Sequence, residues 1–275
     1  MRPSVLAYFL AALLLTAAVN AAGQIAADSG LIYLHVSATE NKGNRPITGI
    51  PKQQFKILED DKPQDIAYFS PTDGPLAVGI LIDAHGDQKD RVKKAMVALT
   101  KHSNPRDQFL VMETGNTTLN EAVYQSLNRV LQLQNGNRAL VLFTDRADPS
   151  AYVFSKIKEL LKEQNVQIYT VAITESAGAT PNRGQDLFRE LAQLSGGSAY
   201  FPVSMVVVED IFTKIATDLQ HQYVIGYRPS NQVQDGKWRK IKVTAEVVDE
   251  KHKAVKLTTR AKSGYFAPAG ASAKN

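Results

Sequence analysis

Apolar runs of strand length alternate with amphipathic stretches between residues 76 and 219, and this alternation constrains the fold more than any other feature. The first run, residues 76–82, is apolar throughout, which is typical of a strand buried on both faces of a sheet. The stretch after it places Val92, Ala95 and Leu99 at the spacing of one helix face. A buried strand followed by such a helix is the unit of an α/β fold.

The same unit recurs along this part of the chain. Strands are expected at residues 109–112, 139–143, 166–173 and 199–203, and helices at residues 119–131, 152–161, 185–194 and 209–219. Gly196 and Gly197 follow a predicted helix, which indicates a helix C-cap and turn. Because strands of this kind need apolar cover on both faces, the sequence predicts a doubly wound, mostly parallel, Rossmann-like α/β sheet.

Shorter strands are predicted on either side of the α/β part. They are expected at residues 31–36, 54–58, 64–69, 223–227, 238–248 and 255–260. Asp60 and Pro63 mark a hairpin turn between two of them. Because a few short strands are marginal alone, we expect the N- and C-terminal strands to form one layer as a flanking β subdomain. This layer would bury Ile57, Ile66, Ile241 and Val243.

The N-terminus has the features of an export signal. Arg2 precedes an uncharged apolar run at residues 5–19, and small residues predict cleavage after Ala21. An uncleaved anchor is the alternative. Cleavage would give a secreted or periplasmic protein without stable membrane insertion. The expected parts are a signal peptide, an N-terminal β segment, an α/β domain, a C-terminal β segment that packs with the first, and a flexible tail, at residues 1–21, 22–73, 74–220, 221–267 and 268–275.

Composition excludes several classes of function. The chain has 32 Lys and Arg against 27 Asp and Glu, a net charge of +5 over 275 residues, which is too mild for a dedicated nucleic-acid binder. It has no cysteine, which excludes disulfides, thiol catalysis and iron–sulfur chemistry. Nine Lys or Arg lie between residues 237 and 262. Because several of them alternate with apolar residues on one predicted strand, we interpret them as a solvated face, with a binding patch as the alternative.

Polar residues gather where the expected parallel strands end. The first strand ends in Asp83, His85 and Asp87, a later loop contains Thr117, and a further strand ends in Asp145. This pattern resembles that of von Willebrand factor A domains, in which a D-x-S-x-S motif, a threonine and an aspartate bind a metal ion. The resemblance implies a site for Mg²⁺, Mn²⁺ or Ca²⁺, hard cations that prefer oxygen ligands.

The sequence departs from that motif at several positions. His85 and Asp87 stand in place of the two serines, and Arg146 stands where the family usually has glycine. Arg146 could balance the carboxylates without a metal, whereas Asp87 could serve as a ligand and His85 could suit a Mn²⁺-like ion. Both alternatives remain open. Arg146 and Asp148 would form the rim that contacts a ligand.

The flanking segments carry a closer resemblance. The runs that carry it are residues 54–66, 76–83, 191–197, 222–227, 235–241 and 264–266. In order and spacing they resemble the secreted VWFA-related bacterial proteins of the acidobacterial type. That resemblance implies a secreted protein with an A domain flanked by β segments and does not imply an enzyme.

No catalytic motif accompanies these features. The sequence contains no G-x-S-x-G pentapeptide and no G-x-G-x-x-G motif. We therefore expect a secreted, non-enzymatic interaction or adhesion module with a degenerate metal site and an extracytoplasmic protein or surface ligand as partner. The alternatives are a binding module that retains its divalent cation and a metal-assisted hydrolase.

Overall fold

The computed structural model describes residues 30–40, 45–71, 74–101, 103–145, 151–174, 183–248 and 254–269, without the side chains of residues 151–153 and 183. The proposed signal peptide, Arg146 and Asp148 lie outside the described residues. Within these ranges, no helix is both long and apolar enough to span a membrane.

A parallel sheet forms the centre of the α/β part. In the described chain its strands have the order β6-β5-β7-β8-β9, and every pair is parallel. They are β5 (Leu76–Asp83), β6 (Gln108–Glu113), β7 (Asn137–Thr144), β8 (Gln167–Ala172) and β9 (Ser198–Tyr200). Every residue of β5 and β8 is buried, as the continuous apolar runs predict. The predicted α/β fold class is confirmed.

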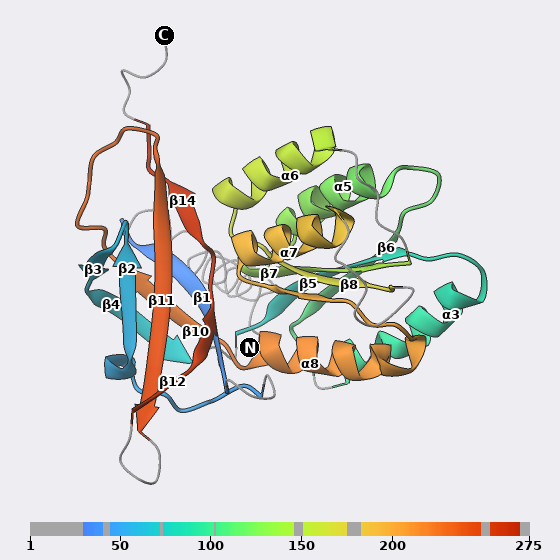
Figure 1. Cartoon of the computed structure of the whole chain (residues 1–275), viewed down its shortest axis with the longest axis horizontal. Coiled ribbons are helices and arrows are strands. Elements are labelled where there is room, and N and C mark those ends of the chain that lie inside the picture. Colours follow the sequence, from blue (N-terminus) through green and yellow to red (C-terminus); the bar gives the residue numbers. More distant parts are fainter. Residues whose placement is uncertain are drawn as a thin grey trace, which may run out of the picture.

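Helices cover both faces of this sheet (Figure 1). One face packs against α5 (Leu119–Leu131), α6 (Ala151–Glu163) and α7 (Arg183–Ser195). The other packs against α3 (Gly86–Ala95), α4 (Val97–Thr100) and α8 (Val208–Gln220), which follows the 3-10 turn η2 (Met205–Val207). The single helical stretch expected after β5 is thus two helices that meet at Met96.

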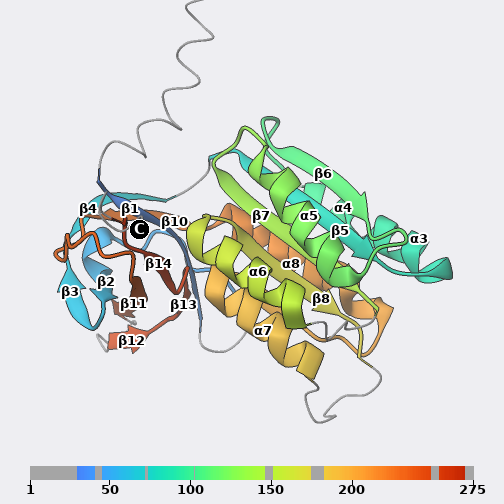
Figure 2. The same ribbon diagram turned by 90° about the horizontal axis from the view of Figure 1, so that it is seen from above.

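The β subdomain contains strands from both ends of the chain (Figure 2). One sheet has the order β13-β1-β10-β4, and the other has the order β12-β11-β2-β3 with β14 beside β11. The N-terminal strands are β1 (Ile32–Thr39), β2 (Phe55–Glu59), β3 (Lys62–Gln64) and β4 (Ile66–Pro71), with the 3-10 turn η1 (Lys52–Gln54) before β2. The C-terminal strands are β10 (Tyr223–Tyr227), β11 (Trp238–Val248), β12 (Ala254–Lys256), β13 (Thr258–Arg260) and β14 (Gly264–Phe266).

The expectation of a single β layer is wrong, because the strands form two sheets with an apolar core between them. Val36 and Ile225 from one sheet and Ile57 and Val243 from the other share this core. Each sheet has an apolar face, and packing the two faces together removes both from water. The chain crosses between the sheets at Asp65 and again at Leu257. The strands expected at residues 64–69 and 255–260 are therefore each divided in two.

Candidate functional site

The predicted polar residues lie at the carboxyl edge of the parallel sheet. β7 pairs with β5 so that Asp83 is opposite Thr144, and β6 lies on the other side of β5. From β5 the chain continues to β6 on one side of β5 and then to β7 on the other side, so the strand order reverses at β5. Open α/β sheets bind ligands outside the carboxyl ends of their strands at such a switch point.

Asp83 is a buried carboxylate that joins β5 to β7. The residue is 1% exposed. Its Oδ2 accepts a hydrogen bond from the Thr144 hydroxyl over 2.7 Å, and its backbone carbonyl accepts one from the Asp145 N–H over 3.1 Å. A carboxylate is stable in a protein interior only when hydrogen bonds or charges compensate its burial. Thr144 thus belongs to the site, although no motif in the sequence singles it out.

Asp145 faces His85 across the same edge. Its Oδ2 accepts the His85 backbone N–H over 3.3 Å and also lies 3.3 Å from the His85 Nδ1. The His85 side chain is 63% exposed, whereas that of Asp145 is 17% exposed. Protonation of the imidazole would turn this contact into an ion pair. These contacts directly join the loops after β5 and β7.

Asp87 and Thr117 do not join this cluster as predicted ligands. Asp87 is exposed in the first turn of α3, where a negative charge is favoured by the helix dipole. Thr117 is also exposed, and its hydroxyl donates to the Thr114 carbonyl of its own loop over 2.8 Å. Both side chains have structural reasons for their positions that involve no metal.

The described residues do not fit the metal site that the resemblance implies. Across this part of the chain, no three His, Asp or Glu side chains are placed where they could hold a metal ion together. The Asp145 carboxylate is directed at His85, and the Thr117 hydroxyl is directed at a backbone carbonyl. We therefore assign no role to a metal ion at this edge of the sheet.

An apolar surface that no sequence motif indicates lies beside this edge. Val206 is 78% exposed, and Val203 and Val207 are 48% and 42% exposed. They follow the carboxyl end of β9, and η2, which contains two of them, contacts α3. In the sequence these valines belong to an apolar run between a predicted strand and a predicted helix. The spacing of this run matches neither a strand nor a helix.

A buried polar cluster joins the α/β part to the β subdomain. Asp218 is 4% exposed, and its two oxygens accept hydrogen bonds from the Tyr169 hydroxyl at 2.6 Å and from Arg260 at 2.7 Å. Burial and the charge of Asp218 raise the pKa of Tyr169 well above its usual value, so its hydroxyl donates. Gln222 donates to Gln167 over 2.9 Å in the same cluster. These residues place the two parts relative to each other.

Comparison with known proteins finds solved structures that are similar to this chain. The structure is similar to "von Willebrand factor type A from Catenulispora acidiphila", with 11% identity and a TM-score of 0.38, over 87% of this chain and 73% of that chain. No protein-family model matches the sequence, and no curated protein matches it. The fold class rests on the strand order and helix layers of the chain itself.

Proposed function

We propose that this protein is an exported, non-enzymatic binding module that contacts a macromolecular partner through the carboxyl edge of its parallel sheet. The observation that carries the proposal is the combination of groups at this edge. His85, Asp87 and Thr117 are exposed there, and the apolar Val206 and Val207 lie close by. Apolar side chains surrounded by polar ones are typical of a surface that another protein covers.

The acidic groups of this edge support binding over catalysis. Asp83 is buried and accepts the Thr144 hydroxyl, while Asp145 accepts hydrogen bonds from His85. A general base must be within reach of a substrate proton, and a nucleophile needs an adjacent base. Both carboxylates already stabilise the loops, so their proposed role is to hold the exposed side chains in place for a partner.

Export and metal independence belong to the same proposal. The apolar run at residues 5–19 supports a secreted or periplasmic location, in keeping with the resemblance to secreted VWFA-related proteins. The direct contact between His85 and Asp145 supports a degenerate adhesion site that works without a divalent cation. The proposed partner is an extracytoplasmic protein or surface ligand.

Site-specific photo-crosslinking in the producing cells tests this proposal. A photoreactive amino acid would replace Thr117 or Val206, which are exposed at the edge, and a control would replace the exposed Lys56 on β2. We expect the same discrete adduct from both edge positions, with and without chelator, and none from the control. Adducts no different from those of Lys56 would contradict the binding edge.

Two further outcomes separate the alternatives. Loss of the adduct on addition of EDTA, with recovery on Mg²⁺ or Mn²⁺, would show a metal-dependent module instead. Chelator-sensitive turnover of hydrolase substrates by the purified exported protein would overturn the non-enzymatic assignment.

A further inference from the structure

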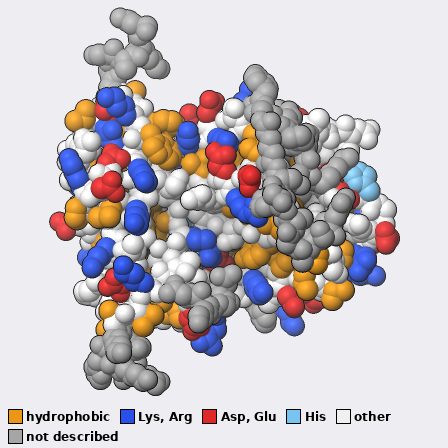
Figure 3. Space-filling model, viewed as in Figure 1, with side chains coloured by type: hydrophobic (Ala, Val, Ile, Leu, Met, Phe, Trp, Pro, Cys, Tyr) orange, Lys and Arg blue, Asp and Glu red, His pale blue; other side chains and the backbone are white. Residues whose placement is uncertain are grey.

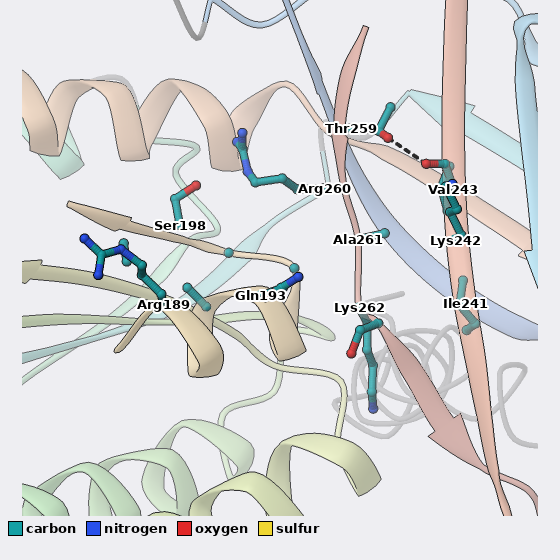
Figure 4. Close-up of a pocket in the computed structure, with 15 residues that line it drawn as sticks. Arg189, Gln193, Ser198, Ile241, Lys242, Val243, Thr259, Arg260, Ala261 and Lys262 are labelled. Carbon is teal, nitrogen blue, oxygen red and sulfur yellow. Dashed lines mark hydrogen bonds between the residues drawn. The ribbon is translucent and has the colours of Figure 1, made fainter. Parts of the chain in front are cut away.

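A cleft of about 570 Å³ lies between the α/β part and the β subdomain, away from the carboxyl edge of β5. Its walls come from α7 and the start of β9 on one side, and from β11 and residues 259–263 on the other (Figure 4). Clefts of roughly 300–1,000 Å³ at domain junctions are typical binding sites for small molecules. The volume is therefore suited to a ligand of metabolite size.

Two glycines beside the cleft allow the backbone to pack closely against neighbouring backbone. Gly196 has a φ of +85°, and a Cβ there would lie 2.6 Å from the Ala261 backbone carbon. A Cβ on Gly197 would lie 1.9 Å from the Ile168 carbonyl oxygen. The Ser263 N–H donates to the Leu194 carbonyl over 3.1 Å, so the two walls are joined by backbone hydrogen bonding. The α/β part and the β subdomain thus approach each other closely at one side of the cleft.

The charge of the lining is one-sided. Arg189, Lys242, Arg260 and Lys262 line the cleft, whereas no Asp or Glu is among the described residues that line it. Figure 3 shows Lys and Arg side chains along this junction. Acidic partners lie outside the lining: Asp218 accepts a hydrogen bond from Arg260 over 2.7 Å. Arginine and lysine side chains of this kind recognise carboxylates and phosphates.

Two of these cations, Lys262 and Arg260, have hydrogen-bond partners behind the wall of the cleft. Lys262 is 9% exposed, and its Nζ donates to the Gln164 carbonyl over 2.8 Å. Burial lowers its pKa to about 8, against the opposing effect of Glu163, so a buried positive charge is unfavourable there. Arg260 has one amino group on Asp218, while its buried Nε has no hydrogen-bond partner among the described residues. An anion in the cleft would add to the contacts of Arg260, whereas the Lys262 Nζ is directed at Gln164, away from Arg260 (Figure 4).

Polar groups that can donate to an anion accompany the cations. Figure 4 shows the Ser198 hydroxyl directed toward the Arg260 side chain across the space between β9 and β13. Gln193 on α7 and Lys242 on β11 are exposed at the two sides of the opening. The structure therefore provides donors on both walls.

We propose that this junction cleft binds an anionic ligand of metabolite size that carries a carboxylate or a phosphate, with Arg260 and Lys242 as its main cationic contacts. This inference is independent of the proposed binding edge. It revises the interpretation of the C-terminal basic run as only a solvated face: Lys240 and Lys242 are exposed as expected, but Lys262 is buried beside a cavity.

Calorimetric titration of the full chain at constant ionic strength tests the proposal. Glucose 6-phosphate probes a phosphate, citrate probes carboxylates, and glucose is the matched neutral control. We expect saturable binding of at least one of the two anions and none of glucose. Comparison of the two anions identifies which of the two groups the cleft accepts. Absence of saturable binding by both anions, or equal binding of glucose, would overturn the proposal.

Variants then locate the binding site. Lys262→Met keeps much of the side-chain volume, and Lys242→Gln changes an exposed residue whose replacement leaves the fold intact. We expect Lys242→Gln to weaken anion binding about tenfold or more, the usual scale for a charge-assisted hydrogen bond, and Lys262→Met to have a smaller effect, because the Lys262 Nζ is directed at Gln164. Lys94→Gln, on the exposed face of α3, is the matched control and should bind as the wild type does. Affinities of Lys242→Gln and Lys94→Gln that equal the wild-type value would overturn the assignment, even if Lys262→Met failed to fold.

Discussion

A buried carboxylate and a neighbouring hydroxyl join β5 to β7 below the proposed binding edge. Replacing Thr144 with Val keeps the shape of the side chain and removes the donor that lies 2.7 Å from the Asp83 Oδ2. Because a hydrogen bond to a charged group contributes about 1.5–3 kcal/mol, we expect the free energy of unfolding to fall by that amount. Urea denaturation measures it.

Thr117→Val is the matched control for this prediction. The Thr117 hydroxyl also donates a hydrogen bond, but the residue is exposed, so water can replace the partner. The expected change is within about 0.5 kcal/mol. Equal losses from the two variants would contradict the structural role assigned to the Asp83–Thr144 pair.

The charge of Lys262 makes stability depend on pH in a predictable direction. Burial lowers its pKa to about 8 in the folded protein, whereas its pKa in the unfolded chain has the ordinary value of 10.5. Between these values the unfolded state binds more protons, so the free energy of unfolding rises with pH. At 1.36 kcal/mol per pKa unit, the wild type should gain about 3 kcal/mol over this window.

Lys262→Met isolates that contribution, because all other groups titrate in both proteins. We expect the stability of the wild type relative to the variant to increase from pH 8 to 10.5, measured by denaturation at constant ionic strength. A difference that stays constant across this range would show that Lys262 is not buried as a charged group.

At the scale of elements, the close contact between β5 and α5 requires a residue without a side chain, Gly79, in β5. A Cβ at Gly79 would lie 2.3 Å from the Val130 Cγ2 and 3.1 Å from the Met112 Cε. Overpacking a tight core costs about 1–3 kcal/mol, so Gly79→Ala should lower the melting temperature. Val130→Ala in the same chain should recover part of the loss, because it removes the methyl group that clashes. Additive losses in the double variant would argue against this contact.

At the scale of the whole molecule, the two ends of the chain depend on each other. β1 lies between β10 and β13, and β2 pairs with β11, so C-terminal strands lack neighbours without the N-terminal ones. Deleting residues 30–71 should expose Trp238, the single tryptophan, which packs edge-on against Phe266 with ring centroids 5.3 Å apart.

Tryptophan fluorescence and limited proteolysis measure the effect of this deletion. We expect a red-shifted emission and rapid cleavage among the basic residues of β11. The helices of the α/β part provide an internal reference by circular dichroism. Unchanged emission and unchanged protease resistance would contradict the interdependence of the two ends.

Local periodicity is what the sequence alone determined. The order of strands and helices from Leu76 to Leu219, and hence the α/β class, followed from apolar spacing because the buried faces of strands and helices repeat every few residues. The polar ends of β5 and β7 were predictable as neighbours for the same reason, since adjacent parallel strands end at one edge. Asp83 and Asp145 lie together at this edge, whereas the Asp87 and Thr117 side chains are exposed beside it.

Contacts between distant segments were decided by the tertiary structure alone. An apolar face shows that a strand needs cover but not which sheet provides it, so the crossings at Asp65 and Leu257 have no signature in the periodicity. The basic residues at 237–262 were interpreted as a solvated face because basic and apolar residues alternate along one predicted strand. The burial of Lys262 depends instead on a contact with the end of α6, which is far away in the sequence. A cleft exists only where two folded surfaces meet, which is why its residues could be recognised only after the two parts were assembled.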